Sequence, residues 1–203
     1  YEDVASSPVQ FGQVSRPGDI KYKDLNHDGV IDSNDQAPIG YNPVPEMTFS
    51  LAAGLNWKGI DFSILLQGAA RSSIYLQQDI AWDNFWGNYY EEHIGRWTPE
   101  TAATATYPRF TKAATAAHPN YYKSDYWLKD SKYLRLKNIQ LGYTIPRKLL
   151  KKFGVRSLRV YANAYNLFTW DNVKKVDPES SNNSNGQFYP QQKVINFGIN
   201  LNF

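Results

Sequence analysis

Residues 193–203 read K-V-I-N-F-G-I-N-L-N-F, and this stretch decides the fold class of the chain. From Ile195 onward every odd position is apolar and every even position is Asn or Gly. A period of two places these two sets on opposite faces of a β-strand. Such a strand suits a soluble antiparallel sheet, whose apolar face covers a core. It suits equally an outer-membrane barrel, whose apolar residues face lipid and whose polar residues face the lumen.

The composition excludes several classes of protein. The chain is long enough to bury a core of its own, and its net charge of +3 over 203 residues is too small to indicate nucleic-acid binding. There is no cysteine, so disulfides and thiol chemistry are excluded. No apolar run reaches about 18 residues, so no transmembrane helix is predicted. The first residues have neither the basic start nor the apolar run of a signal peptide, and we expect a mature product or a fragment.

The two-residue period recurs in four further stretches. It runs from 48 to 58 and from 60 to 67 around Lys58-Gly59, which predicts a hairpin with a very short turn. It returns from 133 to 145 and from 158 to 170, separated by Pro146 and by one or two helical turns that Gly154 closes. A short strand is also expected at 19–23 and a short helix within 79–95. The sequence therefore predicts an all-β chain with about five long strands.

The lengths of the connections alternate along the chain. They are short after Lys58, long from Arg71, moderate after Ile145 and long again from Asp171. Outer-membrane barrels join their strands by short periplasmic turns and long extracellular loops. The pattern predicts extracellular loops at 1–47, 71–131 and 171–192, a hairpin at 48–70, and the last three strands within 133–203. Five strands cannot close a barrel, for which about eight is the practical minimum, so the membrane interpretation makes this chain part of something larger.

Several motifs, taken in order, resemble one family. They are G-D-I-K-Y-K-D-L-N-H-D-G-V-I-D-S-N-D at 18–35, R-W-T-P-E at 96–100, Y-P-R at 107–109, Y-L-R-L-K-N-I-Q-L-G-Y at 133–143, L-R-V-Y at 158–161 and N-L-F-T-W at 166–170, with the final Phe203. Together they resemble the C-terminal end of SusC/RagA-type TonB-dependent transporters of Bacteroidetes. The resemblance covers essentially the whole chain.

What this resemblance implies goes beyond the spacing of the residues. It implies a large antiparallel barrel of about 22 strands with a plug in its lumen, in the outer membrane of a Gram-negative bacterium. It also implies a SusD-like surface lipoprotein over the extracellular mouth, TonB as the source of energy, and glycan or peptide fragments as substrate. In that family the plug and the TonB box are N-terminal, and neither is found in these residues.

The sharpest local motif is D-L-N-H-D-G-V-I-D-S-N-D at 24–35. Oxygen side chains occupy loop positions 1, 3, 5, 9 and 12, and Gly occupies position 6, which is the arrangement of an EF-hand calcium loop. The expected ligands, with the backbone carbonyl of the seventh position, are Asp24, Asn26, Asp28, Val30, Asp32 and Asp35. The loop departs from an EF-hand in having Asp rather than Glu at position 12 and no flanking amphipathic helix. We expect a structural calcium ion on an extracellular loop, and the alternative is an Asp/Asn-rich turn without metal.

Three further groups of side chains are candidates for contacts. The first group is a set of aromatic residues in the 71–131 loop: Trp82, Trp86, Tyr89, Tyr90 and Trp97. They could stack on sugar rings, bind a partner protein, or form the small core that such a long loop needs. Arg135 and Lys137 share the parity of Ile139 and Leu141, so they are expected to point outward near lipopolysaccharide phosphates, or to be ordinary solvated charges. The polar set of the fourth strand is expected to face the lumen, namely Arg159, Tyr161, Asn163 and Tyr165.

The last strand and the scarcity of catalytic groups complete the prediction. The apolar side chains that end the chain on an aromatic residue are expected to be read by the machinery that assembles barrels, namely Phe197, Ile199, Leu201 and Phe203. The three histidines are scattered and no Ser/His/Asp spacing occurs, so an enzyme is not expected. Two functions remain open: an outer-membrane importer, and a soluble calcium-stapled β-sandwich that binds glycans. In a sandwich the apolar faces of the strands meet each other, whereas in a barrel they meet lipid.

Overall fold

The computed structural model describes residues 2–83, 87–112, 117–174, 176–180 and 191–203. The chain divides into two compact units. One comprises Tyr1–Gly40, Ile74–Lys129 and Ser181–Gln187, and the other comprises Tyr41–Ser73, Asp130–Ser180 and Phe188–Phe203. We call them the loop unit and the sheet unit and describe each by itself.

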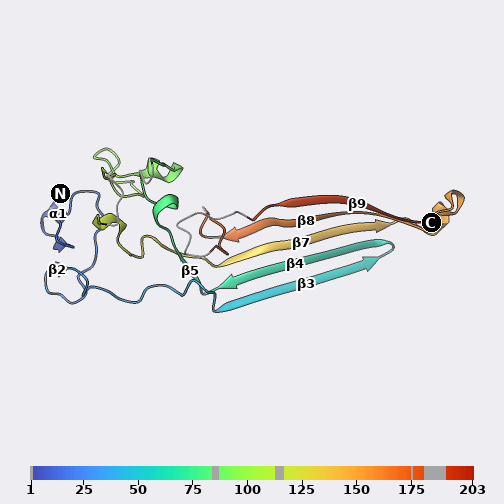
Figure 1. The fold of residues 1–203 in the computed structure, drawn as a ribbon, viewed down its shortest axis with the longest axis horizontal. Helices are drawn as coiled ribbons and strands as arrows, with labels where there is room; N and C mark the ends of the chain where they lie inside the picture. The colour runs from blue at the N-terminus through green and yellow to red at the C-terminus, as the bar shows by residue number, and fades with distance from the viewer. Residues whose placement is uncertain (1, 84–86, 113–116, 175, 181–190) are drawn as a thin grey trace. The chain divides into compact units, whose positions relative to one another are not determined.

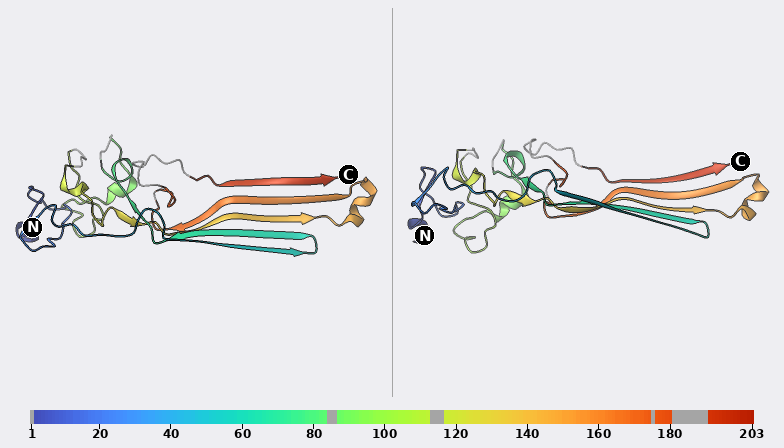
Figure 2. Two further views of the ribbon diagram at one scale, coloured as in Figure 1. Left: turned by 60° about the horizontal axis from the view of Figure 1, so that its bottom comes forward. Right: turned by 90° about the horizontal axis from the view of Figure 1, so that it is seen from below.

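The sheet unit is built on a five-stranded antiparallel sheet with the order β3-β4-β7-β8-β9 (Figure 1). The strands are β3 (Met47–Trp57), β4 (Ile60–Ala70), β7 (Tyr133–Thr144), β8 (Ser157–Asp171) and β9 (Val194–Asn202). Figure 2 shows from two further sides that they lie next to one another in one layer. The prediction of five long strands is confirmed.

Two short connections join strands at the same end of this sheet. Lys58 and Gly59 both have positive φ, +47° and +88°, as a two-residue hairpin turn requires. The β7–β8 connection begins at Pro146 and contains α2 (Arg147–Leu150) and the 3-10 turn η4 (Lys151–Phe153). Gly154 ends it with φ +69°, the left-handed conformation that closes a helix. The predicted helical turn between these strands is therefore confirmed.

A β-bulge interrupts β7. Against β4 its register shifts between Leu136 and Asn138, so one extra residue, Lys137, is accommodated in β7, whereas against β8 this residue stands opposite two residues, Asn166 and Leu167. A bulge of one residue reverses which face the following side chains occupy. Arg135 consequently lies on the face opposite to Ile139, and its side chain is buried, with the residue 1% exposed. The prediction that Arg135 points outward is wrong, because it extended a strict two-residue period across the bulge.

The loop unit consists of short elements joined by irregular chain. They are α1 (Glu2–Ala5), a parallel pair of β1 (Val9–Gln10) and β2 (Val30–Ile31), and the 3-10 turns η1 (Gln78–Ile80), η2 (Glu91–Gly95) and η3 (Pro119–Tyr121). A further two-stranded sheet joins β5 (Ser73–Tyr75) to β6 (Leu128–Asp130). No described helix is both long and apolar enough to cross a membrane.

The short strand expected at 19–23 is not formed. Its backbone amides are instead bonded to side chains: Ile20 N donates to Asn120 Oδ1 at 2.9 Å and Tyr22 N donates to Gln10 Oε1 at 2.6 Å. Because both acceptors are buried, this extended segment is held by polar side chains rather than by a neighbouring strand. The helix expected within 79–95 is represented by the short turns η1 and η2.

Candidate functional site

The register of the sheet aligns apolar side chains from all five strands on one face. One row pairs Leu55 with Phe62, Phe62 with Leu141, Leu141 with Ala162, and Ala162 with Phe197. Neighbouring rows repeat the pattern. The large apolar side chains of this face are exposed, among them Phe49, Leu51, Leu55, Trp57, Leu141, Phe168, Trp170, Ile195, Phe197, Ile199 and Leu201. A soluble monomer rarely exposes so continuous an apolar surface, so this face is built to be covered.

The expected terminal signal residues belong to this same face. Phe197, Ile199 and Leu201 alternate along β9 and are exposed, and Phe203 follows the strand and is exposed as well. Phe197 is 83% exposed, the highest value among the large apolar side chains of the strands. Their positions fit a surface contact rather than a core.

The opposite face of the sheet is polar and carries an ion pair that spans three strands. Arg159 of β8 donates from Nε to Asp61 Oδ1 of β4 at 2.9 Å. The strand between them, β7, has Gly142 at the crossing point, where a Cβ would lie 2.5 Å from both Arg159 Nη2 and Asp61 Oδ1. Only glycine leaves room for this pair. The sequence predicted that Arg159 lies on the polar face, but its pairing with Asp61 depends on the register of the sheet.

The polar face continues from this pair toward β9. The guanidinium of Arg159 lies over the ring of Tyr161, 4.7 Å from its centroid. That ring in turn lies against Gly198 of β9, where a Cβ would come within 2.3 Å of it. Further along, Asn196 donates to Asn163 Oδ1 at 3.0 Å. Charged, aromatic and amide groups thus form an ordered polar wall on the side predicted to face a lumen.

A second charged group lies where β7 begins. Arg135 Nη2 donates to both carboxylate oxygens of Asp177 at 2.8 Å, and its Nε donates to Thr169 Oγ1 at 3.0 Å. Its Nη1 lies 3.3 Å from Glu179, which also accepts a 2.6 Å hydrogen bond from Tyr133. Two carboxylates therefore compensate the buried guanidinium. This cluster fastens residues 177–179 to β7 and leaves Arg135 no access to a lipid phosphate; no sequence pattern could have predicted it.

The aromatic residues singled out in the 71–131 loop separate into two kinds. Trp82 is buried, with its ring centroid 4.9 Å from that of Tyr121. Trp97 is half-buried against Gly18, where a Cβ would meet its ring at 2.5 Å. Tyr89 and Tyr90 are exposed. Trp86 lies outside the described residues. The structure therefore places two of the rings in packing and two at the surface.

The core of this loop is organised around a buried carboxylate. Asp83 accepts hydrogen bonds from the hydroxyls of Tyr121 and Tyr107, and from Thr111 N at 3.2 Å. Burial raises the pKa of Tyr107 and Tyr121, so both remain hydrogen-bond donors at neutral pH. Trp127 packs beside them, 5.9 Å from Tyr107. Sequence reasoning missed Asp83 because an irregular loop has no period that marks an inward position.

The EF-hand-like loop is closed by bonds from its carboxylates to its own backbone. Asp24 accepts from His27 N at 2.6 Å and from Gly29 N at 2.9 Å, and both donors have positive φ. Asp35 accepts from Leu25 N at 2.7 Å and from Asp32 N at 2.9 Å. The backbone amides of Asp32 and Leu25 hold the pKa of Asp35 below its usual value. Among the described residues, no three His, Asp or Glu side chains converge as a metal site.

The remaining expected ligands complete the description of this loop. Asn26 and Asp28 bond to each other at 2.9 Å, from Asn26 Nδ2 to Asp28 Oδ2. Val30 belongs to β2, and its N–H donates to Asp28 Oδ1 at 2.9 Å. Ile31 beside it is buried, which anchors the loop on β1. The six positions thus lie on one surface turn, and the side-chain oxygens of its five polar members accept hydrogen bonds from N–H groups of the loop itself.

Proteins similar to this chain share one description. No family model matches it. TonB-dependent receptor P26 of Formosa agariphila is 30% identical over 219 residues, which covers 100% of this chain and 21% of that protein. TonB-dependent receptor SusC of Bacteroides thetaiotaomicron is 26% identical over 195 residues, which covers 95% of this chain and 18% of that protein. The chain spans about a fifth of the length of the relatives it matches.

Solved structures agree on the fold. The RagAB peptide importer in its open-open state matches with a TM-score of 0.64 and 23% identity, covering 86% of this chain and 19% of that chain. Its closed-closed state matches with a TM-score of 0.65 and 22% identity, covering 88% of this chain and 20% of that chain. The predicted fold class is confirmed, because the five strands have the fold of part of such a receptor barrel. The resemblance expected from the sequence motifs is confirmed by these matches together.

Proposed function

We propose, taking as premise that this chain is related to the SusC/RagA-type TonB-dependent receptors, that it supplies barrel strands and loops to an outer-membrane nutrient importer. The observation that supports this most is the division of one sheet into an exposed apolar face and an ordered polar face. Lipid covers the apolar face and the polar face lines the lumen. A β-sandwich would need a second sheet over the apolar face, and the described residues leave that face open.

The orientation follows from the connections. The end with Lys58-Gly59 and the 146–156 turn is periplasmic, and residues 1–47, 71–131 and 171–192 are extracellular. A SusD-like lipoprotein covers the extracellular mouth, and TonB acts through an N-terminal part of the complete polypeptide. The role is transport rather than catalysis, with glycan or peptide fragments as cargo. RagAB is named a peptide importer, and the exposed Tyr89 and Tyr90 offer rings suited to either kind of fragment or to the lid.

Fractionation of cells that express the complete polypeptide tests this proposal. We expect it in the outer-membrane fraction, soluble only in detergent, and migrating differently on gels before and after boiling, as folded barrels do. Deleting the gene should abolish growth on the fragments that it imports. A complete polypeptide that partitions into the aqueous phase without detergent would overturn the membrane assignment.

We also propose that the 24–35 loop binds calcium as a structural clip. Its ligand spacing, its positive φ at His27 and Gly29, and its exposed position support this. Binding requires Asp24 and Asp35 to exchange their backbone donors for the ion. Titration calorimetry on EDTA-treated protein should show calcium heat that Asp28→Ala removes, whereas absence of heat and an unchanged melting temperature would overturn the proposal.

A further inference from the structure

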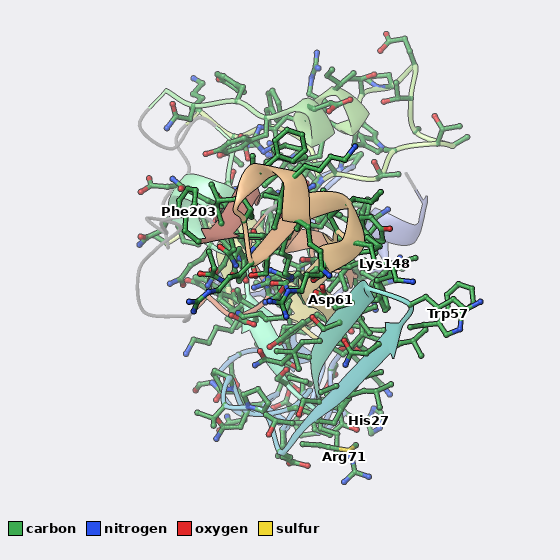
Figure 3. The ribbon with its side chains drawn as sticks, turned by 90° about the vertical axis from the view of Figure 1, so that its right-hand side faces the viewer. His27, Trp57, Asp61, Arg71, Lys148 and Phe203 are labelled. Atoms are coloured by element: carbon green, nitrogen blue, oxygen red, sulfur yellow. The ribbon has the colours of Figure 1, made fainter. Side chains whose placement is uncertain are left out.

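Unpaired positive charges gather at one end of the sheet. The connection between β7 and β8 carries five exposed basic side chains and no carboxylate: Arg147, Lys148, Lys151, Lys152 and Arg156. Lys58 of the β3–β4 turn lies at the same end. Within the described part of the chain, none of the five pairs with an acidic group. Figure 3 looks onto this end, with Lys148 and Trp57 labelled. The residues that the structure describes therefore leave this charge uncompensated.

These charges are fixed to the sheet rather than carried on a loose segment. Leu150 is buried beneath the helical turn. Ile145 N donates to Leu158 O at 2.9 Å, and Arg156 N donates to Asn202 O of β9 at 2.8 Å, so both ends of the turn are bonded to strands. Arg147 and Lys151 are four residues apart on this turn, where like charges repel. A folded arrangement that holds cations this close is stabilised by an anion bound from outside.

Exposed apolar side chains accompany the cations. Leu149 is 65% exposed and Phe153 is 76% exposed, so the basic turn also presents two large apolar side chains to its surroundings. The adjacent strand ends present Trp57 and Tyr143, also exposed, on the apolar face of the sheet. Basic residues together with exposed Leu and Phe are the pattern of a segment that lies in a membrane interface. A free anion or an acidic protein would account for the charges but not for this continuity with the lipid-facing surface.

We infer that this basic turn is a docking surface for the anionic headgroups of a phospholipid leaflet, represented by phosphatidylglycerol. The inference rests on the proposed function, because it requires the sheet to lie in a membrane. The lysines and arginines contact phosphate oxygens, while Leu149 and Phe153 lie at the boundary with the acyl chains. Each cation near an anionic surface contributes a factor of about five in affinity. Removing three of them should therefore weaken binding about a hundredfold.

The complete polypeptide in detergent, titrated with phosphatidylglycerol or phosphatidylcholine and followed by native mass spectrometry, tests this. The variant K148Q/K151Q/K152Q should lose about a hundredfold in affinity for phosphatidylglycerol, with phosphatidylcholine binding unchanged. The matched control K23Q/K123Q/K174Q removes three exposed lysines elsewhere and should bind as the unaltered protein does. An equal loss of phosphatidylglycerol affinity in both variants would overturn the inference that the basic turn is a specific lipid-binding surface. Displacement of the lipid by excess inorganic phosphate would overturn it as well.

A second measurement tests the apolar half of the inference. The chain contains no cysteine, so Phe153→Cys offers an attachment point for an environment-sensitive fluorophore. In nanodiscs containing phosphatidylglycerol the label should shift to the blue and be quenched by nitroxide-bearing lipid, and an unshifted, unquenched label would overturn insertion of this turn. A polypeptide that fails to enter nanodiscs overturns the proposed function and this inference together. Normal insertion with unchanged lipid affinity in the triple variant overturns the inference alone.

Discussion

Replacing Gly142 with Ala should break the ion pair that crosses β7. A Cβ at this position would lie 2.5 Å from Arg159 Nη2 and from Asp61 Oδ1, so the two side chains must separate. Hydrogen bonds to charged groups contribute roughly 1.5–3 kcal/mol, and the partly exposed position of this pair, 22% and 27%, favours the lower end. Alanine itself recovers about 0.5–1 kcal/mol relative to glycine in a strand. We therefore expect a net loss of about 1 kcal/mol in the free energy of unfolding.

A double-mutant cycle isolates this effect. Urea unfolding of the complete polypeptide in lipid vesicles, followed by tryptophan fluorescence, gives the free energy of each variant. In the Asp61→Ala background the obstruction no longer matters, so adding Gly142→Ala should cost nothing or stabilise slightly. Gly54→Ala is the matched control, because this strand glycine on the same face would place its Cβ at an ordinary 3.5 Å from Phe62 O. Equal costs of Gly142→Ala in both backgrounds would refute the steric argument.

Three other perturbations follow from contacts described above. Arg135→Ala leaves Asp177 without its partner and should cost about 3 kcal/mol, seen as faster proteolysis after β8, whereas unchanged cleavage would contradict the fastening role. Asp83→Leu should cost about 1–3 kcal/mol and raise amide exchange throughout the 78–127 loop, with the sheet unaffected as internal control. The pKa of Asp35 is lower in the folded protein than in the unfolded chain. Its contribution to the free energy of unfolding is therefore complete above its usual pKa, and it is lost as the pH falls through the lowered pKa. Protection of the Leu25 amide should follow that pH course, and Asp35→Asn should abolish the dependence.

Much of the sheet could be predicted because strands impose a period on their residues. A strand with lipid or core on one face and polar groups on the other must alternate, and β3 and β9 do so over their length. The β3–β4 turn was equally predictable, since Lys58-Gly59 tolerates positive φ. What the period cannot reveal is which strands become neighbours. Arg159 was assigned to the polar face, yet its pairing with Asp61 required the register across β7.

The loops were less predictable, for a related physical reason. Their cores depend on contacts between positions far apart in sequence, such as Asp83 with Tyr121. No local sequence pattern predicts these contacts. The aromatic richness of the 71–131 segment indicated either packing or binding, and the structure divides the rings between interior and surface. The EF-hand-like spacing could be recognised because ligand positions are set by a short, contiguous loop. Its geometry shows the same oxygens bonded to backbone amides.

The bulge at Lys137 divides β7 into two segments, in which opposite sets of alternate residues lie on the apolar face. In residues 133–136 the even-numbered side chains lie on the apolar face of the sheet, whereas in residues 138–144 the odd-numbered ones do, and the change occurs at Lys137. Deleting Lys137 would remove the extra residue and leave Arg135 on the polar face and Leu136 on the apolar face, whereas deleting a residue away from the bulge, such as Gln140, would move the side chains on one side of the deletion to the wrong face. A substitution scan across the strand would not reveal this constraint, whereas a scan of one-residue deletions would locate it at once.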